Sequence, residues 1–128
     1  VEITYGLERI CMFTQQKKNV YELDWNNDGI KYHEVFHQSE IEFSKYNFEY
    51  ADINSLFKIF NIHEAEANSL ARNNISLPAY DQCLKASHIF NVLDARGAIS
   101  VAERAEFISR IRNIVKLVAE VWIKTQKV

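Results

Sequence analysis

The sequence predicts a mainly α-helical fold, a helical bundle that follows one β-strand at the start of the chain. Three observations support this fold class. The 128 residues include only three glycines and one proline, too few breakers for a sheet with many turns. Apolar residues recur at helical spacing over most of the chain. Two signatures of helix N-termini, at Asp52 and Ser100, precede long apolar stripes.

The expected strand covers residues 1–5, where side chains alternate in character, and Gly6 ends the pattern. The helix that follows has these apolar residues at helical spacing: Leu7, Ile10, Cys11 and Phe13. A single edge strand cannot pair its own backbone groups, so we expect it to complete a sheet made by residues outside this sequence. Because the chain also begins without an initiator Met, we expect it to be a piece of a longer protein.

Further helices are expected after a polar, irregular segment at residues 17–31, which contains a turn at Asn26–Gly29. One helix is expected over about Tyr32–Lys45. The next begins after Asp52, a good N-cap. The apolar residues expected on one face of that helix are Ile53, Leu56, Phe57, Phe60, Ala67 and Leu70.

Two more helices are expected to complete the bundle. Pro78 suits the first turn of one of them, and Gly97 ends the segment after it. The apolar residues expected on the helix that starts near Pro78 are Tyr80, Leu84, Ile89 and Phe90. Ser100 and Glu103 form a capping-box signature ahead of the final helix. The stripe on the final helix, which is typical of a packed core, consists of Ile108, Ile111, Val115, Val118 and Trp122.

Composition and charge bear on the class of protein. A net charge of −2 gives no general attraction to nucleic acid, and the basic residues of the last helix alternate with glutamates, which indicates a solvated face. No apolar run reaches the length of a membrane span, and no signal peptide precedes the first helix. Cys11 and Cys83 match no paired or metal-binding spacing. They indicate free thiols in a reducing compartment, as expected for a cytoplasmic protein.

The segment His33–His37 matches the zinc-peptidase pattern HExxH. On a helix its two histidines share a face, and Glu34 could activate a water. Its flanks, Lys31 before it and the polar pair Gln38–Ser39 after it, are unlike the buried, uncharged surroundings of such helices. No pattern marks a third ligand. We therefore expect no protein-bound zinc.

A second metal-like pattern, Asp24-x-Asn26-x-Asp28-Gly29, opens like a calcium-binding loop. That loop needs a bidentate glutamate at its twelfth position, which is Val35 in this chain. The pattern therefore predicts a turn rich in Asn and Asp, not a calcium site.

The junction from Ile3 to Arg9 carries the remaining signal. Gly6 allows a flat ligand to approach the backbone, because it has no Cβ. Arg9 adds a positive charge beside the positive end of the helix dipole, which suits a phosphate. By themselves these residues form a weak motif, compatible also with an exposed arginine after a glycine turn.

This junction resembles motif 3 of class II aminoacyl-tRNA synthetases. Over nearly its whole length the chain resembles the alpha subunit family of bacterial glycyl-tRNA synthetases. The stretches that carry the resemblance are Glu2–Arg9, Val20–Tyr21 with Trp25, Val35–Gln38, Tyr46–Asp52, Leu77–Tyr80, His88 with Phe90–Asn91, Leu93–Arg96, Ala98–Val101 and Glu103–Arg104. Tyr46–Asp52 and Leu93–Arg96, in order and at matching spacing, are more specific than motif 3 alone.

The resemblance implies a glycine-tRNA ligase that activates glycine with ATP and Mg²⁺ and passes it to tRNA(Gly) in the cytoplasm. It implies a beta subunit as partner, in a heterotetramer of two alpha and two beta chains. Arg9 would be the catalytic residue and contact the ATP phosphates, and Gly6 would lie beneath the adenine. Glu2 and Thr4 would bind the glycine amino group.

The resemblance also divides the chain into the end of a catalytic domain, residues 1–17, and a C-terminal helical domain, residues 18–128. Motifs 1 and 2, which supply a dimer interface and a second ATP-binding arginine, are not among these residues. We therefore expect the isolated chain to be inactive. Two alternatives remain open: a small zinc metallopeptidase that uses His33–His37, and a non-catalytic helical interaction module.

Overall fold

The structure, a computed structural model, describes residues 5–126. It is mainly helical, as predicted, and within residues 5–126 it contains no sheet. The strand expected at residues 1–5 falls almost entirely outside the described residues, and Tyr5 itself is not in a strand. The chain divides into two compact units, unit 1 (Val1–Glu49) and unit 2 (Tyr50–Val128).

Unit 1 is built from short helices and one tight turn. Its elements are α1 (Leu7–Thr14), η1 (Val20–Glu22), α2 (Tyr32–Lys45) and a π-helical turn, η2 (Tyr46–Tyr50), which continues α2 to the boundary of the unit. The bounds predicted for α2 are confirmed. Among the described residues of unit 1, Leu23 alone is buried, with 3% of its surface exposed.

Side-chain hydrogen bonds hold unit 1 together in place of a large core. The Gln15 amide donates to the Asp24 carbonyl at 3.1 Å and accepts from the Asp24 N–H at 2.8 Å, so the end of α1 is tied to the turn. In the turn, the Asn26 Oδ1 accepts from the N–H groups of Asp28 and Ile30. Gly29 has a positive φ of 89°, a conformation that glycine adopts without strain. The predicted turn is confirmed.

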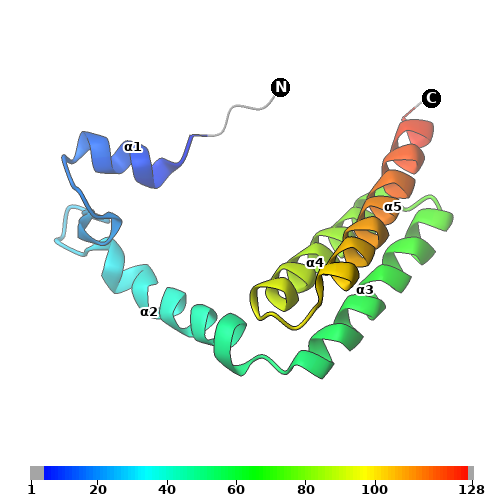
Figure 1. The fold of residues 1–128 in the computed structure, drawn as a ribbon. Helices are drawn as coiled ribbons and strands as arrows, with labels where there is room; N and C mark the ends of the chain where they lie inside the picture. Colours follow the sequence, from blue (N-terminus) through cyan, green and yellow to red (C-terminus); the bar gives the residue numbers. More distant parts are fainter. Residues whose placement is uncertain (1–4, 127–128) are drawn as a thin grey trace. The chain divides into compact units, whose positions relative to one another are not determined.

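Unit 2 is a bundle of three helices, α3 (Ile53–Arg72), α4 (Ser76–Ala95) and α5 (Val101–Thr125), which lie side by side (Figure 1). Short connections make consecutive helices antiparallel. The start of α3 is capped by the Asp52 carboxylate, which accepts from the Ser55 N–H at 2.7 Å. The start of α5 has the reciprocal bonds of a capping box between Ser100 and Glu103. Both predicted N-termini are therefore confirmed.

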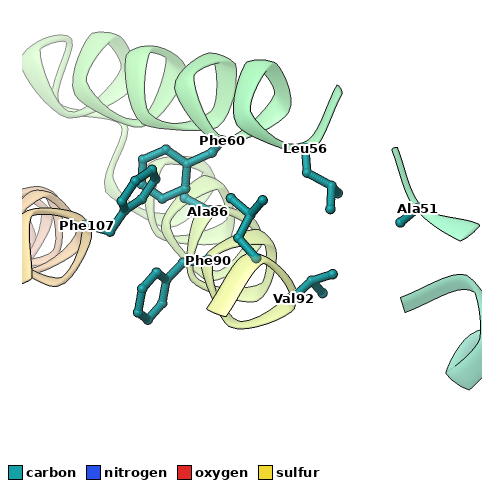
Figure 2. Close-up of a cluster of buried hydrophobic side chains, with 8 residues drawn as sticks. Ala51, Leu56, Phe60, Ala86, Phe90, Val92 and Phe107 are labelled. Atoms are coloured by element: carbon teal, nitrogen blue, oxygen red, sulfur yellow. The ribbon is translucent and has the colours of Figure 1, made fainter. Parts of the chain in front are cut away.

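The core of unit 2 forms two clusters of buried side chains. The first is aromatic and lies where all three helices meet, as Figure 2 shows for Phe60, Phe90 and Phe107. The Phe60 and Phe107 rings pack edge to face, with centroids 4.6 Å apart, a favourable aromatic geometry. The second cluster consists of Ala67, Ala71, Ala79, Cys83, Ile114, Val118 and Val121. Burial raises the pKa of the Cys83 thiol, which favours its neutral form in this cluster.

The apolar face predicted for α3 is confirmed, since its residues are buried or packed against the two clusters. The apolar faces predicted for α4 and α5 are wrong in part. Tyr80 and Leu84 are exposed on α4, and Val115 and Trp122 are exposed on α5. The residues buried in their place on α4 include the small Ala79, Cys83 and Ala86, because small side chains let neighbouring helix backbones approach closely.

Within residues 5–126, α1, α3 and α4 end in the same backbone motif, in which the residue after the C-cap has a positive φ. This residue is Gln16 after α1, Asn74 after α3 and Gly97 after α4, with φ values of 53°, 60° and 62°. In each case two backbone N–H groups turn back onto the last turn of the helix; after α4 they are Ala98 to Leu93 and Gly97 to Asp94, both at 3.0 Å. The motif satisfies carbonyls that a helix end would otherwise leave unpaired.

Arg110 on α5 departs from the expected solvated face. Its side chain is 27% exposed and forms a two-pronged ion pair with Glu64 on α3, while Nη2 donates to Asn61 at 2.6 Å. The guanidinium carbon lies 4.6 Å from the Phe60 ring centroid and 5.0 Å from that of Phe107. The hydrogen bonds to Glu64 raise the pKa of Arg110. This arginine therefore links α5 to α3 directly above the aromatic cluster.

Candidate functional site

The first turn of α1 presents the glycine and arginine that the sequence predicts for a nucleotide site. Gly6 is the N-cap, and its carbonyl accepts the first helical hydrogen bond, from Ile10 at 3.2 Å. Its φ of −69° and ψ of 118° are open to any residue. A Cβ added there would meet the Arg9 side chain at an ordinary contact distance of 3.8 Å. Nothing within the described chain therefore requires glycine at this position.

Arg9 is exposed in the first turn of α1. None of the ion pairs or side-chain hydrogen bonds found among residues 5–126 involves it, in contrast to Arg104 and Arg110, which pair with carboxylates. Its guanidinium lies near the N-terminal end of the helix, where the backbone dipole is positive. The combination is suited to an anion, and a phosphate accepts two parallel hydrogen bonds from a guanidinium. Glu2 and Thr4, the predicted glycine-binding residues, lie outside the described residues.

A second feature of unit 1 is a pocket of about 390 Å³ between α1 and α2. Three aromatic rings line it, those of Trp25, Tyr32 and Phe36, with centroid separations of 4.7 to 6.2 Å. Two carboxylates, Glu8 and Asp24, also line it, together with Leu7, Cys11 and Leu23. We call this the aromatic–acidic pocket.

The two carboxylates of the aromatic–acidic pocket differ in their partners. Asp24 forms an ion pair with Lys31, and the hydrogen bond from that lysine lowers the pKa of Asp24. Glu8 has no cationic partner among residues 5–126; its contact is the Tyr32 hydroxyl, which donates to it at 3.4 Å. Burial first, and then the negative charge of Glu8, raise the pKa of Tyr32.

The residues of the HExxH pattern are engaged by other parts of unit 1. The His33 Nδ1 lies 3.1 Å from the Tyr21 carbonyl oxygen, and the His37 ring lies 4.6 Å from the Tyr21 ring. Glu34 accepts a hydrogen bond from the Lys31 N–H at 2.7 Å and so caps the start of α2. Over residues 5–126 no three His, Cys, Asp or Glu side chains gather in a way that could hold a metal ion. The same part of the chain contains no helix long and apolar enough to cross a membrane.

The aromatic–acidic pocket was missed by sequence reasoning, although part of its signal is local. Tyr32 and Phe36 are four residues apart, which places them on one face of α2. Trp25 and Glu8 join them only through the turn and through the bonds between Gln15 and Asp24, which no spacing in the sequence indicates.

Comparison with known families identifies the family of the chain. The family model described as glycyl-tRNA synthetase alpha subunit matches residues 1–127. This match places the chain among the aminoacyl-tRNA synthetases, which are ligases. Within that class, the chain belongs to the glycyl-tRNA synthetase alpha subunit family, so the resemblance found in the sequence is confirmed. Membership of an alpha subunit family implies a beta subunit partner and tRNA.

Proposed function

We propose that the chain contributes motif 3 of a class II active site to glycine activation, and that Arg9 is its catalytic residue. The observation that carries the proposal is the family match over residues 1–127. Arg9 is exposed in the first turn of α1 and has no carboxylate partner among residues 5–126, which supports the proposal because such a cation is available to an anionic substrate.

The reaction begins when a glycine carboxylate oxygen attacks the α-phosphorus of ATP. A new bond forms between these two atoms, the bond from that phosphorus to the bridging oxygen breaks, and pyrophosphate leaves with the electron pair. Negative charge grows on the departing phosphates, and a guanidinium already in place stabilises that charge without reorganising. Arg9 therefore acts more strongly on the transition state than on bound ATP.

The remaining assignments concern the substrates around Arg9. Gly6 lies beneath the adenine, where a Cβ would intrude, and Glu2 and Thr4 bind the glycine amino group. Mg²⁺ bound to the ATP phosphates would neutralise part of their negative charge. The glycyl group then passes to the terminal adenosine of tRNA(Gly), in a heterotetramer of two alpha and two beta subunits in the cytoplasm.

The test is glycine-dependent ATP–pyrophosphate exchange by the alpha subunit that carries motifs 1 and 2, assembled with its beta partner. Arg9→Ala is expected to lower the exchange rate by about a hundred- to a thousand-fold, the usual effect of losing one preorganised donor. Arg9→Lys should restore only part of it, because an ammonium cannot form the two-pronged contact.

Arg112→Ala is the matched control, since Arg112 is also exposed on a helix but belongs to unit 2. It should leave exchange unchanged, and melting temperatures should be the same for all variants. Near-normal exchange by Arg9→Ala would remove Arg9 from the site. The 128-residue chain alone is expected to show no exchange, because binding energy from motifs 1 and 2 is missing.

A further inference from the structure

We propose that the aromatic–acidic pocket of unit 1 binds an arginine side chain of a partner protein. The inference stands on the geometry of this pocket and does not rest on the proposed role of Arg9. The pocket, of about 390 Å³, has room for the head group of a long side chain.

The rings of the pocket favour a cation. Trp25, Tyr32 and Phe36 form a cluster in which the Trp25 and Phe36 planes meet at 74° and the Tyr32 and Phe36 planes at 38°. Tilted rings around a pocket present both faces and edges to an occupant. Cations bind to the faces of such rings, and tryptophan provides the strongest attraction.

The two carboxylates of the pocket favour a positively charged occupant. No basic side chain is among the residues that line the pocket, and the charge of Glu8 is not balanced by a cation elsewhere among residues 5–126. A phosphate or nucleic acid backbone would be repelled. The neighbouring pocket of unit 1 differs, because its lining has more basic side chains than carboxylates. It is lined by Lys17, Tyr21, Glu22, Lys31 and His33.

A guanidinium suits the pocket better than an ammonium. It is flat, stacks on aromatic rings and donates two parallel hydrogen bonds to one carboxylate. The Glu8 carboxylate can still accept both bonds, because the Tyr32 hydroxyl donates to Oε1 at 3.4 Å and each carboxylate oxygen has two lone pairs. A protein-borne arginine suits it better than the free amino acid, whose own carboxylate would meet Glu8 and Asp24.

The experiment is a titration of the 128-residue chain with N-acetylarginine amide, followed through the indole N–H resonances of its two tryptophans. Trp25 is 53% exposed beside the carboxylates, while Trp122 is 42% exposed in an apolar groove between α4 and α5, and so serves as an internal control. Trp25→Phe and Trp122→Phe assign the two signals. The Trp25 signal should move with saturation and the Trp122 signal should stay.

Two further comparisons test the chemistry. N-acetylcitrulline amide has the same shape without the charge and should not bind. Glu8→Gln still accepts from Tyr32 but lacks the charge, and should weaken binding by about two- to fivefold, as expected for an exposed ion pair. Glu22→Gln makes the same change of net charge in the neighbouring pocket and should leave the affinity unchanged.

The proposal is overturned if the Trp25 signal shows no saturable movement, if both tryptophans move equally, or if the citrulline compound binds equally well. Equal affinities of Glu8→Gln and Glu22→Gln would also overturn it, since Glu8 would then play no part. If free arginine binds as tightly as the amide, the site accepts a free cationic amino acid and the assignment to a protein side chain is wrong.

Discussion

The contacts within residues 5–126 give no structural reason for a glycine at position 6 or an arginine at position 9. Gly6 has a backbone conformation that any residue can adopt, and the nearest atoms to a Cβ added there, among residues 5–126, belong to the Arg9 side chain at 3.8 Å. Arg9 has no partner among residues 5–126. The proposed ATP site would account for both residues, and this can be tested separately for the glycine.

Gly6→Ala and Gly6→Ser are expected to fold normally and to lose ATP binding. Serine is a better N-cap than alanine by about 1 kcal/mol, so Gly6→Ser should melt at a temperature no lower than Gly6→Ala. Both add a Cβ where the adenine is proposed to lie, and both should raise the KM for ATP in pyrophosphate exchange. If the serine variant binds ATP normally, the adenine does not lie against Gly6.

Arg110 is a residue whose role is structural and whose partners lie far away in the sequence. Arg110→Ala should destabilise unit 2 by about 1.5–3 kcal/mol, since charged hydrogen bonds to Glu64 and packing on Phe60 and Phe107 are lost together. A double-mutant cycle with Glu64→Ala in urea unfolding should give a coupling energy of about 1 kcal/mol. Strict additivity would mean that the ion pair contributes nothing. Arg112→Ala, on the exposed side of α5, is the control.

At the scale of the elements, the ends of the helices determine where each begins and stops. Three helices use the same C-terminal motif with three different residues in the left-handed conformation, Gln16, Asn74 and Gly97. Glycine adopts it without strain and asparagine with little, whereas most other residues pay about 1–2 kcal/mol. The three positions therefore form a natural series.

Gln16→Gly is expected to stabilise unit 1 by about 1 kcal/mol, and Asn74→Gly to stabilise unit 2 by a smaller amount. Gly97→Ala should destabilise unit 2 by about 1 kcal/mol. The last effect would be one of backbone strain, because a Cβ at Gly97 has no neighbour within 4 Å. Urea midpoints followed at Trp25 for unit 1 and Trp122 for unit 2 measure these changes. A neutral or destabilising effect of Gln16→Gly would contradict the proposed strain at this position.

The N-terminal caps are expected to make the stability of α3 and α5 depend on pH in the acid range. Hydrogen bonds with Ser55 and with Ser100 lower the pKa values of Asp52 and Glu103 below their ordinary values of 3.8 and 4.5. A lowered pKa in the folded state adds stability that is fully present above the ordinary value. It is lost as the pH falls through the folded-state pKa. Stability should therefore decline below about pH 4.5.

Asp52→Asn and Glu103→Gln keep an acceptor for the capping bonds but cannot be protonated in this range. The double variant should lose less stability than the parent between pH 7 and pH 3, as measured by urea midpoints. Glu66 lies on the exposed side of α3 and caps no helix, so Glu66→Gln should lose as much stability between pH 7 and pH 3 as the parent. An unchanged acid dependence in the double variant would show that other carboxylates determine it.

At the scale of the whole molecule, the two units are stabilised differently. Unit 2 has two buried clusters shared among three helices. In unit 1, of the residues described, only Leu23 is buried, and the apolar Leu7, Phe13 and Trp25 are largely exposed. Such a contrast fits a family whose members act as subunits of a larger assembly, since exposed apolar groups are commonly covered there.

The sequence alone determined the helical class, the start of α3 and α5, the bounds of α2 and the family, because caps, breakers and motifs are local signals. Only the tertiary structure decided which side of α4 and α5 is buried. The spacing of Val115 and Trp122 suits a core as well as that of Ile114 and Val121, and packing against α3 and α4 buries the second pair. Likewise, Arg110 meets Glu64, and Glu8 meets Tyr32, across separations that no local pattern encodes. Local chemistry shapes each helix, but long-range packing determines which faces and partners it has.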